Sequence, residues 1–276
     1  QVLRGLDLQV PRGSVVGLLG RNGSGKSTFL QCAVGLLKID GGQLSLLGEE
    51  SWRLSADAKS RLGFVQQTPE LPQWMGGRQL LEYTASFYPH WNWRLANRLV
   101  EAWKIDLRTR VRALSEGTVR QLAIVMALAP EPEVLVLDEP VAGLDPVARR
   151  TFLQELLDIA LEGDRTVLFS THVTSDLDRA ADRVAILVDG KIRFSGELDT
   201  LKERVVRLYV RSQRELPATL GLPGTLREEI ARHEATAVVE GPDPQAIERL
   251  QDSLRAHVEV NPLGLDDIFL AMHHAE

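Results

Sequence analysis

Nine consecutive residues near the start of the chain have the composition of a phosphate-binding loop. They fit the pattern G-x-x-x-x-G-K-[ST] and are Gly20, Arg21, Asn22, Gly23, Ser24, Gly25, Lys26, Ser27 and Thr28. The glycines permit backbone angles that other residues avoid, so successive amide N–H groups can surround phosphate oxygens. In such a loop the lysine reaches the β- and γ-phosphates, and the hydroxyl after it ligates Mg²⁺. The pattern therefore predicts a site for a nucleoside triphosphate and Mg²⁺, with Lys26 as a catalytic residue.

The residues on either side of this loop predict the elements that hold it. The apolar run 15–19 is typical of a buried strand, and residues 28–35 have a short helical pattern. A helix that begins at the loop adds the positive end of its dipole to the anion site. This context favours a phosphate loop over a chance glycine-rich turn.

A second apolar strand ends in two acids. Residues 134–137 are Val-Leu-Val-Leu, and Asp138 and Glu139 follow directly. In open α/β sheets ligands bind at the carboxyl ends of the strands, where these carboxylates would emerge. A solvated turn is the other interpretation, but Lys26 upstream favours a phosphoryl-transfer site. We therefore expect Asp138 to bind Mg²⁺ and Glu139 to polarise the attacking water.

Composition limits the class of protein. The chain has 276 residues, a net charge of -6 and one cysteine, Cys32. The acidic balance opposes a broad nucleic-acid-binding face, and a single cysteine excludes an intrachain disulfide and suits a reducing cytosol. No apolar run reaches the ~18–20 residues of a membrane helix, so a role at a membrane would need a span from another chain. Because the chain begins with Gln1 rather than Met, we expect further residues upstream.

The remaining patterns predict an α/β fold with a mostly parallel sheet covered on both faces. Near-continuous apolar runs, typical of buried parallel strands, alternate with helical patterns. The runs lie at 62–65, 134–137, 166–169 and 184–188, and the helical patterns at 116–129, 146–161 and 174–180. Residues 6–10 and 43–47 predict further strands in an antiparallel β subdomain, and Asp189-Gly190 predicts a hairpin to 192–194.

Two segments depart from this alternation. A helical pattern rich in tryptophan, from about 72 to 130, predicts an inserted helical subdomain. Its aromatic residues would form a small core; the alternative is that some are exposed and contact a partner. Residues 205–276 predict three strands and two helices in a small α+β accessory domain, in which no catalytic cluster is evident.

Four further stretches complete a resemblance to the ATP-binding subunit of ABC transporters, over residues 1–204. Leu114-Ser115-Glu116-Gly117-Thr118 is similar to the family's signature L-S-G-G-Q and precedes the acidic strand. Gln67, with Gln66 as a close rival, is similar to the glutamine that links the Mg²⁺ site to the membrane partner. Ala142-Gly143-Leu144-Asp145 resembles the loop that contacts the opposite subunit, and His172 resembles the histidine that touches the γ-phosphate.

The resemblance implies an ATPase that works as a dimer at the cytoplasmic face of the cell membrane. Two such subunits, identical or paralogous, meet head to tail. ATP and Mg²⁺ then lie between the phosphate loop of one subunit and Ser115 and Gly117 of the other, with Asp145 at the same junction. Gln67 would join Ser27 and Asp138 around the metal. A separate integral membrane permease would move the substrate. Residues 205–276 resemble the tails of exporter-type subunits, which implies export. No nucleic acid partner is expected.

Two departures from the family pattern keep other interpretations open. Glu116 and Thr118 replace a glycine and a glutamine, and a carboxylate near phosphate repels it unless the side chain turns away. No aromatic residue that could stack on adenine precedes Phe29. One alternative is a soluble ABC-type ATPase acting on DNA or ribosomes, which the acidic charge opposes. The other is a regulatory nucleotide-binding module that seldom hydrolyses ATP, which the altered signature suggests.

Overall fold

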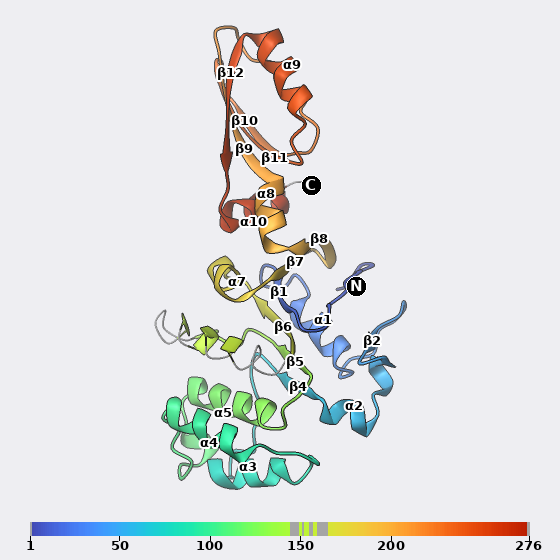
Figure 1. Ribbon diagram of the computed structural model, residues 1–276, viewed down its shortest axis with the longest axis vertical. Helices are drawn as coiled ribbons and strands as arrows, with labels where there is room; N and C mark the ends of the chain where they lie inside the picture. The colour runs from blue at the N-terminus through green and yellow to red at the C-terminus, as the bar shows by residue number, and fades with distance from the viewer. Residues whose placement is uncertain (1, 144–148, 151, 155–156, 159–164, 275–276) are drawn as a thin grey trace. The chain divides into compact units, whose positions relative to one another are not determined.

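The computed structural model describes residues 2–143, 149–150, 152–154, 157–158 and 165–274 (Figure 1). The chain divides into two units, Gln1–Phe194 and Ser195–Glu276. This division falls within strand β8 (Lys191–Glu197), ahead of the boundary after residue 204 that the sequence predicts.

The first unit contains a six-stranded sheet whose spatial order differs from the order of its strands along the chain. In space the strands are β4 (Leu62–Val65), β5 (Val134–Leu137), β6 (Thr166–Thr171), β1 (Val15–Leu19), β7 (Arg183–Val188) and β8. The pairs from β4 through β7 are parallel. Their register sets Leu137 beside Val65 and Phe169, and Leu19 beside Thr171. The carboxyl ends of these strands therefore meet at one edge of the sheet.

Helices cover both faces of this sheet, as the apolar runs predict. The described helices of the unit are α1 (Lys26–Ala33), α2 (Ala56–Ser60), α3 (Gly77–Ala85), α4 (Trp93–Ala102), α5 (Glu116–Leu128) and α7 (Thr174–Ala180). Val16 and Leu18 of β1 pack in one cluster with Leu30 of α1. On the opposite face, a Cβ added at Gly17 would lie 1.9 Å from Leu177 Cδ2, so only glycine lets α7 approach β1 this closely.

The helical subdomain has an aliphatic core, and here the predicted aromatic core is wrong. Its helices α3, α4 and α5 bury leucines such as Leu80, Leu95 and Leu122. The aromatic side chains with a large exposed area are Trp74, Tyr83, Phe87 and Trp93. An amphipathic helix has room for aromatic rings at its margins, because aliphatic side chains already fill the buried stripe. The alternative of exposed aromatic residues is the one that the structure supports.

The predicted antiparallel strands near the N-terminus are shorter than expected. Residues 6–10 form no strand, although Leu6, Leu8 and Val10 still pack against the core in alternation. The predicted strand 43–47 is reduced to β2 (Ser45–Leu46), which pairs with β3 (Glu49–Glu50). Asp189 and Gly190 both have positive φ and join β7 to β8 in the predicted hairpin turn. The helix expected at 146–161 lies mostly outside the described residues.

The second unit is a four-stranded antiparallel sheet with helices, as its α+β pattern predicts. Its elements are α8 (Leu198–Arg204), β9 (Val205–Ser212), β10 (Thr225–Ile230), β11 (Glu234–Glu240), α9 (Pro244–Leu254), β12 (Ala256–Pro262) and α10 (Leu265–His274). The strand order is β10-β11-β9-β12. Leu250 of α9 packs with Leu208 and Ala237 from one face of the sheet. The sequence missed β10, an edge strand that contains Arg227, Glu228 and Glu229; charges there discourage pairing with another sheet.

Candidate functional site

The phosphate loop connects β1 to α1 and has the conformation that its glycines permit. Gly23 and Gly25 have φ of 82° and 107°, and Gly25 is the N-cap of α1. A Cβ added at Gly20 would lie 2.5 Å from Ser24 Oγ and 2.8 Å from the Leu187 carbonyl oxygen. Strand, loop and helix thus follow one another as predicted, with α1 beginning at Lys26. Arg21 and Asn22 are exposed.

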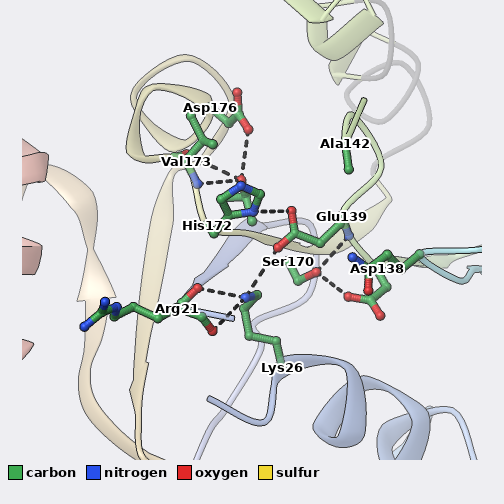
Figure 2. Close-up of polar contacts among 12 residues, drawn as sticks. Arg21, Lys26, Asp138, Glu139, Ala142, Ser170, His172, Val173 and Asp176 are labelled. Atoms are coloured by element: carbon green, nitrogen blue, oxygen red, sulfur yellow. Dashed lines mark hydrogen bonds and ion pairs between the residues drawn. The ribbon is translucent and has the colours of Figure 1, made fainter. Parts of the chain in front are cut away.

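Lys26 is buried inside its own loop and points toward the acidic strand end (Figure 2). Its Nζ donates hydrogen bonds to the carbonyl oxygens of Gly20 at 2.7 Å and Arg21 at 3.2 Å. The same atom lies 3.4 Å from Glu139 Oε1. The ammonium group is therefore held beside the loop backbone, by contacts that an incoming phosphate oxygen could replace.

The two acids after β5 are buried and held by Ser170 of β6. The Ser170 hydroxyl donates to Asp138 Oδ1 at 2.6 Å and accepts from the Glu139 backbone N–H at 2.8 Å. Glu139 has a φ of 48°, which is uncommon for a residue with a side chain and is typical of functional sites. Ser170 holds this conformation from one side, and the Ala142 N–H donates to the Glu139 carbonyl from the other.

His172 completes the group of charged and polar side chains at this edge. Its Nδ1 lies 2.9 Å from Glu139 Oε2, so the Glu139 carboxylate is bonded to Lys26 on one oxygen and to His172 on the other (Figure 2). The His172 side chain is 44% exposed, whereas that of Glu139 is 4% exposed. One side of the imidazole therefore faces the solvent while the carboxylate is enclosed.

A buried ion pair supports the loop that carries His172. The hydroxyl of Thr171 donates to Asp176 Oδ2 at 2.9 Å, and Arg149 Nη2 donates to the same oxygen at 2.8 Å. Asp176 is fully buried. Sequence reasoning missed Thr171, Asp176 and Arg149. The available signal was the mostly polar run 170–176 directly after an apolar strand.

The signature segment lies at the start of α5 and is exposed. Ser115 is the N-cap of α5, where its hydroxyl accepts from the Thr118 N–H at 3.2 Å and lies 2.8 Å from Thr118 Oγ1. Ser115 and Glu116 are exposed, and Gly117 is half-buried. The hydroxyl and the free N–H groups of the first helical turn are thus accessible to another molecule.

Gln67 and Gln66 follow β4 and both have exposed side chains. Arg120 of α5, which the sequence analysis did not single out, donates to the carbonyl oxygen of Gln67 at 2.8 Å and to that of Ala142. Burial lowers the pKa of this guanidinium from its ordinary value. Asp145 lies outside the described residues, so its predicted contact has no structural counterpart here.

The structure therefore brings together Lys26, Glu139 and His172, with Asp138 joined to them through Ser170. The residues also fit a bound phosphate. Ser24 Oγ is buried and has no hydrogen-bond partner among the described residues, and the loop is too tight at Gly20 for any larger side chain. An anion in the loop would offer acceptors to this hydroxyl and to Lys26. The described part of the chain contains no group of three or more His, Cys, Asp or Glu residues placed to hold a metal ion, so a metal here would need hydroxyl, amide or phosphate oxygens as well.

Comparison with known families decides the class. A family model described as ABC transporter matches residues 3–142, half of the chain. The chain belongs to the ABC transporter family. The predicted α/β P-loop fold and the predicted class, an ATP-binding ATPase subunit, are thereby confirmed.

Relatives of this ABC subunit align along most of its length. It is 32% identical over 281 residues to the Nod factor export ATP-binding protein I of Burkholderia thailandensis, covering 98% of this chain and 91% of that protein. It is 34% identical over 234 residues to the daunorubicin resistance ATP-binding protein DrrA3 of Streptomyces coeruleorubidus, covering 80% and 73%.

Solved structures agree with the fold of this ABC subunit. An ATP-binding subunit of an ABC transporter superposes with a TM-score of 0.67 at 28% identity, covering 73% of this chain and 86% of that chain. The dimeric post-hydrolysis state of the ATP-binding cassette MJ0796, bound to ADP and Pi, superposes with a TM-score of 0.63 at 23% identity, covering 71% and 90%. Among the described residues, no helix has the length and apolar character needed to cross a bilayer.

Proposed function

We propose that this chain hydrolyses ATP in a head-to-tail dimer and so drives a separate membrane permease. The observation that carries the proposal is the Glu139 carboxylate, which follows β5 and is enclosed between Lys26 Nζ of the phosphate loop and His172 Nδ1. A base, a cation and an imidazole at this place are the groups that hydrolysis of a terminal phosphate requires.

Nucleotide binding uses the loop from Gly20 to Thr28. Its backbone N–H groups and the start of α1 hold the phosphate oxygens, and Lys26 exchanges its carbonyl partners for the β- and γ-phosphates. Ser27, Asp138 and Gln67 would hold Mg²⁺, which neutralises charge on the phosphates when bound. Ser170 keeps the Asp138 carboxylate in place by its 2.6 Å hydrogen bond.

Hydrolysis needs one proton acceptor and a fixed attack geometry. Glu139 accepts a proton from the water that attacks the γ-phosphorus, the bond from that phosphorus to the β–γ bridging oxygen breaks, and ADP and phosphate leave. His172, hydrogen-bonded to Glu139, orients the carboxylate and interacts with the γ-phosphate. A positioned base typically contributes about 10²–10⁴-fold to the rate.

The second half of each site comes from the opposite subunit. Ser115 offers an exposed hydroxyl and Gly117 an unhindered N–H at the start of α5, a helix of 13 residues whose dipole favours an anion there. Asp145 is proposed to contribute at the same junction. A relative of known structure is described as dimeric with ADP and Pi, which is consistent with this arrangement.

The permease is proposed to contact the helical subdomain at the cytoplasmic face of the membrane. Trp74, Tyr83 and Phe87 are 70%, 50% and 66% exposed, and the rings of Tyr83 and Phe87 pack edge to face at 5.0 Å. Exposed aromatic residues that lie together favour a protein interface. The names of two relatives speak of export and of drug resistance, which supports export as the direction of transport.

The experiment that tests the proposal is Glu139→Gln. We expect the variant to bind ATP, to accumulate as an ATP-bound dimer in analytical ultracentrifugation, and to lose at least about 100-fold in steady-state ATPase rate. Glu133→Gln is the matched control, because it makes the same change just before β5, where Glu133 pairs with Arg61. Wild-type turnover by Glu139→Gln would refute the role of Glu139.

The altered signature favours a second candidate, a regulatory module with low turnover. Glu116 is exposed in the first turn of α5, on the segment that would contact the partner's triphosphate. A carboxylate there weakens anion binding. If the wild-type chain binds ATP and dimerises but has no more turnover than Glu139→Gln, the regulatory function replaces the first proposal.

A further inference from the structure

Arg120 joins two loops that both carry proposed site residues. Its Nη2 donates to the Gln67 carbonyl oxygen at 2.8 Å, and its Nη1 donates to the Ala142 carbonyl oxygen. Gln67 follows β4, and Ala142 closes the turn that begins at Glu139, through a hydrogen bond of 3.1 Å from the Ala142 N–H to the Glu139 carbonyl. One guanidinium on the signature helix is therefore bonded to the backbone of both loops.

The site is built for an arginine rather than for a generic cation. The planar fork of arginine directs two N–H groups to two separate acceptors, whereas lysine presents a compact charge. The Arg120 side chain is half-buried, and its Nε is buried without a hydrogen-bond partner among the described residues. Keeping a charged group in such surroundings costs free energy unless opposite charges lie nearby.

Two carboxylates supply that opposite charge. Glu116 lies one helical turn before Arg120, the i, i+4 spacing that brings side chains together, and both Glu116 and Glu139 attract the guanidinium electrostatically. Glu116 is also the residue that departs from the signature glycine. In this chain the unusual carboxylate has a counter-charge on its own helix.

We propose that Arg120, with Glu116 as an opposite charge one helical turn away, is a positioning residue for ATP hydrolysis. Its hydrogen bonds attach the Gln67 loop and the turn after Glu139 to α5, whose N-cap is Ser115. Gln67, Glu139 and Ser115 therefore keep fixed positions relative to one another. The inference rests on the proposed function, because the role given to Arg120 is to position residues of the proposed ATPase site.

Hydrogen–deuterium exchange tests the tether without nucleotide. In Arg120→Gln we expect the amides of residues 66–68 and 141–143 to exchange about tenfold faster than in the wild type, because both carbonyl contacts are lost. Arg112→Gln is the matched control, since it removes an exposed arginine just before the same helix, and it should exchange like the wild type. Unchanged exchange in either loop of Arg120→Gln would overturn the proposal.

Steady-state kinetics separate positioning from a general loss of stability. Arg120→Gln should lower kcat about tenfold, raise the Mg²⁺ concentration for half-maximal rate and leave KM for ATP within about twofold. Arg120→Lys, which keeps the charge but not the fork, should fall between the wild type and Arg120→Gln in both assays. If Arg120→Gln does not fold, Arg120→Lys decides, and wild-type exchange in that variant would count against the tether.

A double-mutant cycle tests the part of Glu116. Glu116→Gln alone should speed exchange of the two loops by about twofold, and it should add nothing in the Arg120→Gln background, because the charge that Glu116 attracts is then gone. Full additivity would overturn the coupling between Glu116 and Arg120. A wild-type chain without ATPase activity would refute the proposed function but not the tether, since exchange needs no turnover; unchanged exchange in an active enzyme would refute the tether alone.

Discussion

The phosphate loop and the signature segment both lie at the N-terminus of a helix, yet they differ in how many of their polar side chains are buried and bonded within this chain. At the loop, Lys26 is 6% exposed and donates to the loop carbonyls of Gly20 and Arg21. It also forms an ion pair with Glu139, which follows β5 and is 3% exposed. In the signature segment, Ser115 and Glu116 are exposed, and the Ser115 hydroxyl is bonded to Thr118 of its own helix. A buried charge costs free energy unless it has partners within the chain, whereas an exposed hydroxyl is solvated and can later bind another molecule. The difference supports a site shared between two subunits.

The largest expected effect comes from Lys26→Ala, which removes the cation from the loop. The two phosphates then lose their charge-assisted hydrogen bonds, and we expect nucleotide affinity to fall at least about 100-fold, measured by fluorescence of a labelled ATP analogue. Lys38→Ala, at an exposed position after α1, should bind like the wild type. If Lys26→Ala binds the analogue as tightly as the wild type, the buried phosphate loop is not the nucleotide site, and the comparison between the two segments fails.

A smaller effect is expected from Ser115→Ala, which tests the exposed signature segment. Binding of ATP to one subunit should not change, but ATP-dependent dimerisation in the Glu139→Gln background should weaken about tenfold, because one hydrogen bond to the partner's phosphate is lost. Sedimentation equilibrium measures this constant.

The control for Ser115→Ala accounts for its role as a helix cap. Ser55 caps α2 in the same way and accepts from the Ala58 N–H at 3.1 Å, so Ser55→Ala should lose a similar ~1 kcal/mol of stability. Dimerisation should stay normal in that variant. If both variants weaken the dimer equally, loss of the cap rather than of the phosphate contact is the cause, and the shared site is refuted.

The smallest effect is expected from Ser170→Ala, which leaves both acids in place but removes their common hydrogen bond. We expect kcat to fall about fivefold and the free energy of unfolding to fall by ~1–3 kcal/mol, since two buried polar groups lose a partner. Thr171→Val removes a neighbouring hydroxyl that binds Asp176 instead, so it should cost similar stability with less effect on kcat. Chemical denaturation and steady-state rates measure the two quantities. Equal kcat values for the two variants would mean that Ser170 has no special part in placing the acids.

The phosphate loop and the acidic strand end each consist of contiguous residues, so both could be predicted from the sequence. The glycines, Lys26 and Ser27 lie in one turn between a strand and a helix, and Asp138 and Glu139 directly follow an apolar strand. Backbone geometry places such groups without help from distant parts of the chain. The aromatic core was predicted wrongly because hydrophobic character alone does not say which side of a helix is buried.

The tertiary structure decided which of these segments meet. The chain order of the strands does not reveal that β1 lies between β6 and β7, and it is this order that sets the residues after β6 beside the loop and the acids. Ser170 could be read as one more polar residue at a strand end, and Arg120 as a solvated charge on a helix. Their partners are 32 and 53 residues away along the chain. Such contacts form only when the strands assemble into the sheet and buried polar groups pair with one another, so no local sequence pattern predicts them.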